Sequence, residues 1–149
     1  MNEDFRDVLA LLLGAEARFL VVGAHALAVH GVPRATGDLD VWVDRESANV
    51  ERVFAALTRF GAPLLALGIS RGDFEAPDRV IQIGLPPRRI DILTDITGVE
   101  FGAAWAQRVV SRVAGLDVPF LGRADLIANK KATGRLRDLA DVEALEAGS

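Results

Sequence analysis

Three aspartates in apolar surroundings are the residues of this sequence whose type and spacing most clearly indicate chemistry. Asp38 and Asp40 lie in the run TGDLDVWV, and Asp91 lies in RIDIL. Successive side chains of an extended chain alternate between two faces, so Asp38 and Asp40 project from the same face. Two close carboxylates repel each other, and neither ionises readily in a half-buried strand unless a cation lies between them. The spacing therefore favours a divalent metal site, although an isolated D-x-D motif is more often part of a surface edge strand.

The composition limits the classes to which this chain can belong. Its 149 residues, half of them hydrophobic, suffice for one core but not for two ordinary domains, so we expect residues 1–149 to form a single domain. The absence of cysteine excludes disulfides and thiolate metal sites, which leaves hard oxygen ligands. A net charge of −4 argues against sequence-indifferent coating of nucleic acid. Basic residues concentrate late in the chain and matter only if the fold brings them opposite the aspartates.

The apolar N-terminal segment is predicted to be an amphipathic helix and not a secretion signal. Glu3, Asp4 and Asp7 give it an acidic leader, whereas signal peptides begin with basic residues. Its apolar residues from Phe5 to Leu13 fall at helical spacing. Nowhere does the sequence approach the roughly 20 apolar residues that a membrane-spanning helix needs. We therefore expect a cytoplasmic protein that does not enter a membrane.

Hydrophobic periodicity predicts the elements that would position the aspartates. Strands are predicted over residues 18–22, 38–43, 80–84, 89–93, 108–113 and 118–121. Helices are predicted near the N-terminus and over residues 24–30, 47–60, 101–107, 123–133 and 138–147. Residues 61–78 read as irregular apart from a turn near 64–67, and the strands flanking Pro86 and Pro87 as a hairpin. The pattern indicates an α+β (α/β-like) protein with a mixed β-sheet flanked by helices and with C-terminal helices.

A glycine turn supplies a second candidate site. Gly23 connects the predicted strand over residues 18–22 to the following helix, in which Ala24 is the first residue. Free backbone N–H groups at the start of a helix, together with the positive end of its dipole, bind phosphate groups well. The sequence therefore predicts a phosphate-binding turn at Gly23 and Ala24, upstream of the D-x-D motif.

In this order, the glycine turn, the D-x-D motif and the later aspartate resemble the nucleotidyltransferase superfamily with the DNA polymerase β-like palm. The tail DLIANKKATGR, followed by DLAD, is more specifically similar to a small bacterial branch that includes nucleotidyltransferase-type toxins of abortive-infection systems. The resemblance extends from about Phe19 to Leu145. It implies a minimal nucleotidyltransferase fold that transfers a nucleoside monophosphate from a nucleoside triphosphate.

The resemblance also implies roles for the aspartates. Asp38 and Asp40 would hold two Mg²⁺ (or Mn²⁺) ions about 3.5–4 Å apart, and Asp91 would complete the ion nearer the acceptor. Asp91 would either act as the general base or orient it. Three carboxylates suit Mg²⁺, which prefers oxygen ligands and usually retains several waters.

Nucleotide binding is assigned by the same resemblance. Lys130 matches the phosphate-binding lysine of the family, with Lys131 as the alternative, and Arg34 would reach a phosphate or fix the D-x-D loop. Ala24 stands where the superfamily has Gly or Ser, so a hydroxyl contact is missing but the backbone donors remain. The expected nucleotide-binding residues are Gly23, Ala24, Arg34, Thr36 and Lys130.

Three other residues have two interpretations each. Asp138 stands where a helix N-cap belongs and Asp141 follows three residues later, as in a capping box, but the resembled branch uses acids here to orient its lysine or arginine. Trp42 has the parity of the aspartates and would line the nucleotide cleft or belong to the core.

Two functions from different classes remain open. The first is an active transferase whose acceptor is an RNA end or a protein hydroxyl, as a component of a toxin–antitoxin system. The second is a catalytically silent module that binds a nucleotide or a partner protein. A small-molecule acceptor is less favoured, because the relatives that use one carry an added helical domain for which little chain is left. A minimal palm is open on its acceptor side, so a homodimer or an antitoxin-like partner protein is expected to complete it.

Overall fold

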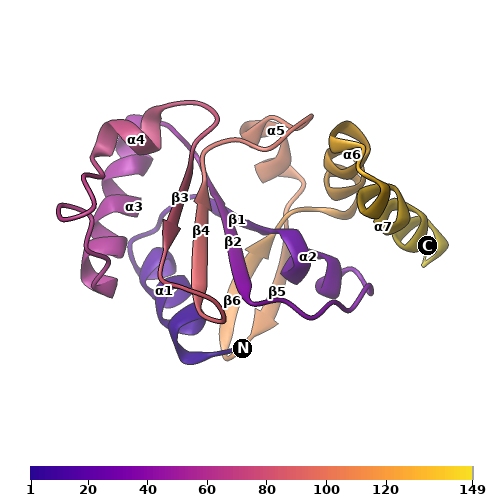
Figure 1. Ribbon diagram of the computed structural model, residues 1–149, viewed down its shortest axis with the longest axis horizontal. Helices are drawn as coiled ribbons and strands as arrows, with labels where there is room; N and C mark the ends of the chain where they lie inside the picture. The colour runs from indigo at the N-terminus through magenta and orange to yellow at the C-terminus, as the bar shows by residue number, and fades with distance from the viewer. Residues whose placement is uncertain (149) are drawn as a thin grey trace.

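The computed structural model describes residues 1–148, which form seven helices and six strands (Figure 1). In chain order the elements are α1 (Glu3–Gly14), β1 (Phe19–Val22), α2 (Gly23–Val29), β2 (Asp38–Val43), α3 (Ser47–Phe60), α4 (Arg71–Glu75), β3 (Val80–Ile83), β4 (Arg89–Leu93), α5 (Phe101–Ala106), β5 (Val109–Val113), β6 (Leu116–Phe120), α6 (Arg123–Thr133) and α7 (Leu136–Ala147). Among these described residues, none of the helices has the length and hydrophobicity to cross a membrane.

All six strands belong to one mixed sheet, in the order β3-β4-β2-β1-β6-β5. The central strand β2 is antiparallel to β1 and parallel to β4, while β3 pairs antiparallel with β4 as the predicted hairpin. At the other side of the sheet, β6 is parallel to β1 and antiparallel to β5. The end of β1 therefore lies beside the start of β2, and the start of β4 lies beside it in turn. The predicted α+β class with a mixed sheet and C-terminal helices is confirmed.

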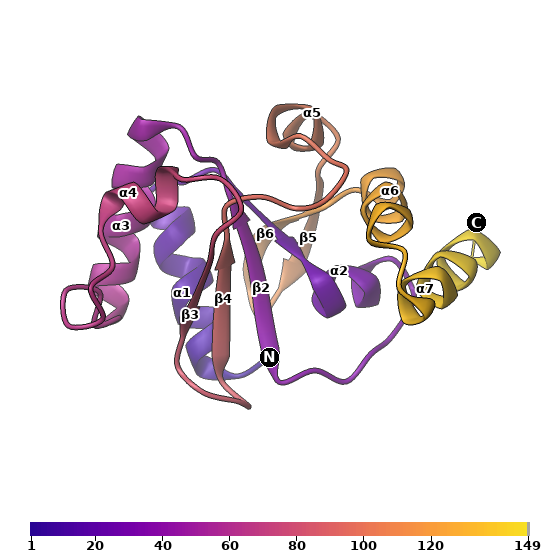
Figure 2. The same cartoon turned by 45° about the horizontal axis from the view of Figure 1, so that its top comes forward.

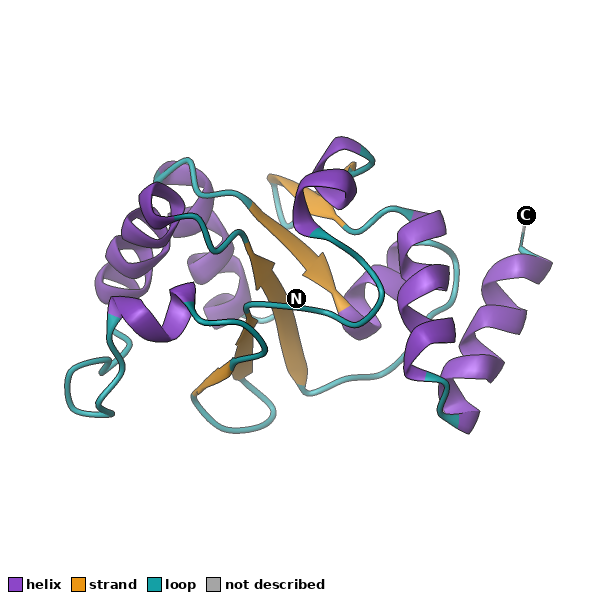
Figure 3. Ribbon diagram, turned by 90° about the horizontal axis from the view of Figure 1, so that it is seen from above, coloured by secondary structure: helices purple, strands orange, loops and turns teal. Residues whose placement is uncertain are grey.

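Helices lie on both sides of the sheet (Figure 2). The helices α1, α3 and α4 lie on one side, whereas α2, α6 and α7 lie on the other. The inward stripe of α1 consists of Phe5, Val8, Leu9 and Leu12, all of them buried. Burying each such side chain contributes about 1.5–3 kcal/mol relative to leaving it exposed. Hydrophobic burial therefore stabilises the packing of α1 against the sheet. The C-terminal helices α6 and α7 project beyond the core (Figure 3).

Trp42 belongs to the core. Its side chain is 1% exposed, and its indole ring packs edge to face against Phe101 with ring centroids 4.9 Å apart. The indole nitrogen donates to the carbonyl oxygen of Thr94 at 3.3 Å, which satisfies its polar atom. The cleft-lining interpretation of Trp42 is therefore wrong.

Three elements differ from the sequence-based expectation by more than one residue. Helix α4 lies in the stretch predicted to be irregular, and a reciprocal capping box between Ser70 and Asp73 marks its start. Strand β6 begins at Leu116, because a tight turn at Ala114 and Gly115, both with positive φ, joins it to β5. Helix α7 begins at Leu136, two residues earlier than predicted.

Gly122 provides a test of the packing that positions α6. A Cβ atom built there would lie 2.6 Å from the carbonyl oxygen of Gln107, which is backbone and cannot rotate away. We expect Gly122→Ala to lower the free energy of unfolding by about 1–3 kcal/mol, measured by urea denaturation. Gly14→Ala is the control, because nothing lies within 4 Å of a Cβ at Gly14. That variant should be neutral or more stable by up to about 1 kcal/mol, since alanine favours helix. Equal stability of the two variants would contradict the close approach.

Candidate functional site

A cavity of about 280 Å³ opens where the end of β1 and the start of β2 face α6 and α7. Its lining includes every residue predicted to bind the nucleotide, together with both aspartates of the D-x-D motif. Two further cations, Arg135 and Arg137, line it from the start of α7. Asp91 is not part of the lining, because it lies deeper in the sheet and is only 8% exposed. The fold thus brings together residues that are separated by more than a hundred positions in the chain.

Gly23 allows the aspartates to approach the turn after β1. Val22 is paired with Asp40 across the β1–β2 ladder, so the next residue faces the carboxylate. Gly23 has a φ of +67°, and a Cβ there would overlap the carboxylate of Asp40. Both observations require glycine at this position. The turn consequently stands directly beside the D-x-D motif, as the sequence pattern predicts.

The three aspartates share one face of the sheet. In the parallel ladder between β2 and β4, Asp40 is paired with Asp91 and Asp38 is paired with Arg89. Residues directly opposite each other project to the same side, as do residues two apart in one strand. Separation of the three aspartates onto opposite faces of the sheet is therefore excluded, although Asp91 does not reach the cavity that Asp38 and Asp40 line.

Arg89 lies between two of these carboxylates. Its Nη2 atom is 2.6 Å from Oδ2 of Asp38, and its Nε atom is 3.1 Å from Oδ1 of Asp91. Within residues 1–148, no three acidic, histidine or cysteine side chains are gathered closely enough to hold a metal ion. The carboxylates are thus arranged around a guanidinium group, which neutralises part of their charge. The assignment of Asp38, Asp40 and Asp91 as metal ligands stays a prediction.

The electrostatics of the aspartates nevertheless favour an additional cation. Burial, together with the charges of Asp91 and Asp38, raises the pKa of Asp40 from an ordinary 3.8 to about 6. Burial also raises the pKa of Asp91, against the opposing effect of Arg89. One guanidinium therefore does not fully compensate three carboxylates on one face. The chemistry of this donor set, oxygen atoms with excess negative charge, fits Mg²⁺ or Mn²⁺.

Lys130 is held on the opposite wall of the cavity by two buried carboxylates. Its Nζ atom is 3.1 Å from Oδ2 of Asp141 and 3.5 Å from Oδ1 of Asp138. Both aspartates are almost completely buried. Arg34 also pairs with Asp141, and Arg135 pairs with Asp138 at 2.6 Å. Two anions thus orient three cations, leaving a net positive wall that faces the D-x-D motif.

This geometry gives Asp138 both of the roles considered for it and gives Asp141 only the orienting one. Arg135 is the N-cap of α7, and Asp138 is its third residue, which accepts from the backbone nitrogen of Arg135 in a capping box; Asp138 therefore has a capping role, but not as the N-cap. The hydrogen bond from Arg135 holds the pKa of Asp138 well below its usual range, which keeps the carboxylate charged. Asp141 lies a turn further along, beyond any capping position. The aspartates orient Lys130 and its neighbours, as the resemblance implied.

Lys131 and Arg137 are distinguished by their surroundings. Lys131 forms an exposed pair with Glu146 at 3.2 Å and does not line the cavity. Arg137 does line it, and its side chain has no ion pair or hydrogen bond within the described part of the chain.

Sequence reasoning grouped Arg135 and Arg137 with the late basic residues but did not assign them to the site. The sequence signal that could have placed them there is their position just after Gly134, where the chain turns from α6 into α7.

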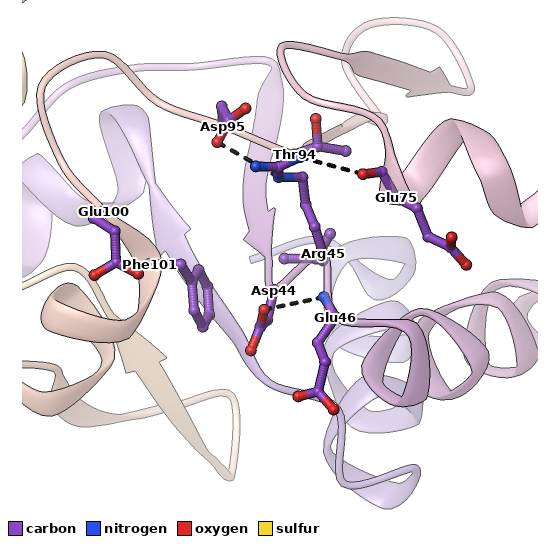
Figure 4. A pocket seen from close by; sticks show the side chains of 9 residues that line it. Asp44, Arg45, Glu46, Glu75, Thr94, Asp95, Glu100 and Phe101 are labelled. Carbon is purple, nitrogen blue, oxygen red and sulfur yellow. Dashed lines mark hydrogen bonds and ion pairs between the residues drawn. The ribbon is translucent and has the colours of Figure 1, made fainter.

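A second cavity, of about 390 Å³, lies at the opposite end of β2 (Figure 4). Its lining is rich in acidic residues, but three of them already have partners within the fold. Asp44 accepts from the backbone nitrogen of Glu46 at 3.2 Å, and Asp95 pairs with Arg45 at 3.7 Å. Glu100 caps the start of α5 by accepting from two backbone N–H groups. These three acids have structural roles, and the first cavity, which gathers the residues predicted from the sequence, is the candidate site.

Comparison with solved structures finds the same fold in a putative nucleotidyltransferase from Thermotoga maritima. The alignment covers 96% of this chain and 88% of that chain, with a TM-score of 0.59 and 16% sequence identity. Neither a protein-family profile nor a curated protein matches the chain. Identity at this level establishes the fold and not the activity. The chain therefore has a nucleotidyltransferase-like fold, and its activity has to be argued from the cavity.

The raised pKa of Asp40 generates a pH prediction. Because the pKa is about 6 in the folded state and 3.8 ordinarily, the folded protein binds more protons between about pH 4 and pH 6. Stability without metal should therefore fall as pH rises through this window, by up to about 3 kcal/mol, and stay level above it. Asp40→Asn cannot ionise and should lack this contribution. Thermal melting across the pH range, compared with the wild type, measures the difference.

The control for this measurement is Asp117→Asn. Asp117 forms an exposed pair with Arg112 in the β5–β6 hairpin, away from the cavity. Its pH profile should run parallel to that of the wild type. If the profile of Asp40→Asn also runs parallel to the wild type, the carboxylates do not interact as described.

Proposed function

We propose that this protein is a divalent-metal-dependent nucleotidyltransferase, which moves a nucleoside monophosphate from a nucleoside triphosphate to a hydroxyl group of an RNA or a protein. The observation that carries the proposal is the cavity, in which carboxylates on β2 face a wall of oriented cations on α6 and α7. A triphosphate with bound metal ions is a ligand that needs both kinds of charge within a few ångströms. The shared fold of the Thermotoga maritima protein supports the same conclusion.

The cationic wall is the proposed binding surface for the triphosphate. Lys130 is only 13% exposed and is fixed by two buried anions, so little entropy is lost when it meets a phosphate. Arg137 lines the same cavity, and its charge has no ion-pair partner among residues 1–148. Backbone donors at Gly23 and Ala24 add to this surface. Helix α2 has only seven residues, so side-chain cations contribute more than its dipole.

The carboxylates are the proposed catalytic group. Asp38, Asp40 and Asp91 would hold two Mg²⁺ or Mn²⁺ ions, which when bound neutralise charge on the α-phosphate and on the departing pyrophosphate. The acceptor oxygen bonds to the α-phosphorus as the bond from this phosphorus to the bridging oxygen of pyrophosphate breaks. The hydroxyl proton passes to a base, for which Asp91 is our candidate because burial raises its pKa. Asp91 either accepts that proton or orients the hydroxyl.

A catalytically silent module is the second candidate function. Two observations favour it: Arg89 lies among the carboxylates, and Ala24 lacks a hydroxyl for phosphate. Such a module would bind a nucleotide or a partner protein without transfer. The two candidates differ in their need for metal, because only the enzyme requires Mg²⁺ for tight triphosphate binding. Melting with a nucleoside triphosphate, with and without Mg²⁺, separates them.

The more specific resemblance to abortive-infection toxins is also a proposal. Its support is the tail sequence, whose aspartates and lysine form the oriented group described above. A toxin of this kind would act in the cytoplasm and would have an antitoxin-like partner or form a homodimer. Induced expression in a bacterial host should arrest growth, and Asp40→Asn should not. Light scattering of the purified chain reports whether it forms a dimer.

The transfer reaction is tested with nucleotides radiolabelled at the α-phosphate, an RNA pool and total cell protein. We expect Mg²⁺-dependent label that is removed either by ribonuclease or by protease, which identifies the acceptor class. Asp38→Ala, Asp40→Ala and Asp91→Ala should each abolish it, because each removes a ligand of the ions. Asp117→Asn, in the exposed hairpin, should label as the wild type does. Transfer at a near wild-type rate by either D-x-D variant would refute the assignment.

The two neighbouring lysines test the phosphate site. Lys130→Met keeps the apolar stem but removes the charge that faces the cavity, so triphosphate affinity should fall by about tenfold or more. Lys131→Met removes a charge that pairs with Glu146 at the surface and should change affinity less than about twofold. Fluorescence titration with a labelled nucleoside triphosphate measures both. A large loss for Lys131→Met with none for Lys130→Met would place the triphosphate elsewhere.

A further inference from the structure

Arg89 is a cation placed within the sheet among the carboxylates of the candidate site. It is paired directly with Asp38 across the β2–β4 ladder, and Asp91 is two residues further along its own strand. Its guanidinium group bridges the two carboxylates, and the side chain is 28% exposed. The bridge is therefore partly shielded from solvent, yet open enough for the guanidinium to leave it.

The hydrogen bonding of the bridge is incomplete: Nη2 of Arg89 donates to Oδ2 of Asp38 at 2.6 Å and to Oδ2 of Asp91 at 3.4 Å, but a second pair of atoms is not satisfied. Nε of Arg89 and Oδ1 of Asp91 are 3.1 Å apart, but both are buried atoms without a well-directed hydrogen bond within residues 1–148. A buried acceptor in this condition destabilises the folded state. Since a metal ion accepts oxygen ligands from a wider range of directions than an N–H group provides, it would use this oxygen better.

We propose that Arg89 is the internal counter-ion of Asp38 and Asp91, and that a divalent cation competes with its guanidinium for these two carboxylates. This inference rests on the proposed function, because it takes the carboxylates as metal ligands. Arginine cannot lose its proton in a protein, so it has to leave the site as a cation. The apparent affinity for metal is then lowered by the fraction of molecules in which the guanidinium occupies the site.

The competition also links metal binding to nucleotide binding. A displaced guanidinium is a planar donor that suits the oxygen atoms of a phosphate. A triphosphate in the adjacent cavity offers it a new anionic partner and so compensates for the lost bridge. By reciprocity, the triphosphate raises metal affinity by the factor by which metal raises triphosphate affinity. Arg89 is thus a positioning residue that keeps the carboxylates paired until both ligands are present.

The test is a calorimetric titration of the full chain with Mn²⁺ alone, comparing Arg89→Gln with Arg88→Gln. Arg88 is the neighbouring cation, but it pairs with Asp4 at 3.3 Å and is more than half exposed. Arg89→Gln should bind Mn²⁺ about tenfold more tightly than the wild type, or more, because the competing cation is gone. Arg88→Gln should stay within about twofold of the wild type. Arg89→Lys, which keeps the charge but cannot bridge, should fall between wild type and Arg89→Gln.

Thermal melting gives a second readout that does not depend on catalysis. Without metal, Arg89→Gln should melt below the wild type, because Asp38 and Asp91 lose their partner. Saturating Mn²⁺ should raise its melting temperature by more than it raises that of the wild type. Mn²⁺ binding that is unchanged or weakened in Arg89→Gln would overturn the competition while leaving the proposed function intact. Failure of all variants to bind Mn²⁺ would overturn both.

Discussion

Like-charged carboxylates on neighbouring strands are the constraint around which this protein is arranged. The register of β2 and β4 places Asp40 directly beside Asp91 on one face, where burial makes their ionisation unfavourable. The apolar residues that alternate with the charged ones in each strand fix that register. A slip of one residue would turn the buried side chains of Leu39 and Ile90 outward. The core therefore forces the acids together, and the surroundings have to supply positive charge.

Two clusters of charged side chains line the site, and they carry opposite net charge. In the sheet, the carboxylates surround one cation, Arg89, and negative charge remains in excess. On the helices, Asp138 and Asp141 are surrounded by cations, and positive charge remains in excess. The cavity lies between the two groups, so a ligand carrying metal ions and phosphates would complete both. This complementarity, more than any single residue, is why we favour nucleotidyl transfer over a silent module.

Much of this arrangement could be predicted from local patterns, and some of it could not. Period-two alternation fixed the shared face of Asp38 and Asp40, and helical periodicity placed Lys130 within α6. The position of Arg89 was not predictable, because it depends on the register between two strands about fifty residues apart in sequence. The burial of Asp141 likewise follows from the packing of α7 near Arg34, a contact of high sequence separation. Helix α4 was missed because its five residues carry little periodicity.

The most direct measurement is a crystal structure with Mn²⁺ and a non-hydrolysable nucleoside triphosphate, with anomalous scattering used to locate the metal. The account predicts Mn²⁺ bound by Asp38 and Asp40, the triphosphate in the cavity against Lys130, and the guanidinium of Arg89 away from its bridging position. Mn²⁺ or triphosphate bound elsewhere, with the Asp38–Arg89–Asp91 bridge intact, would contradict it.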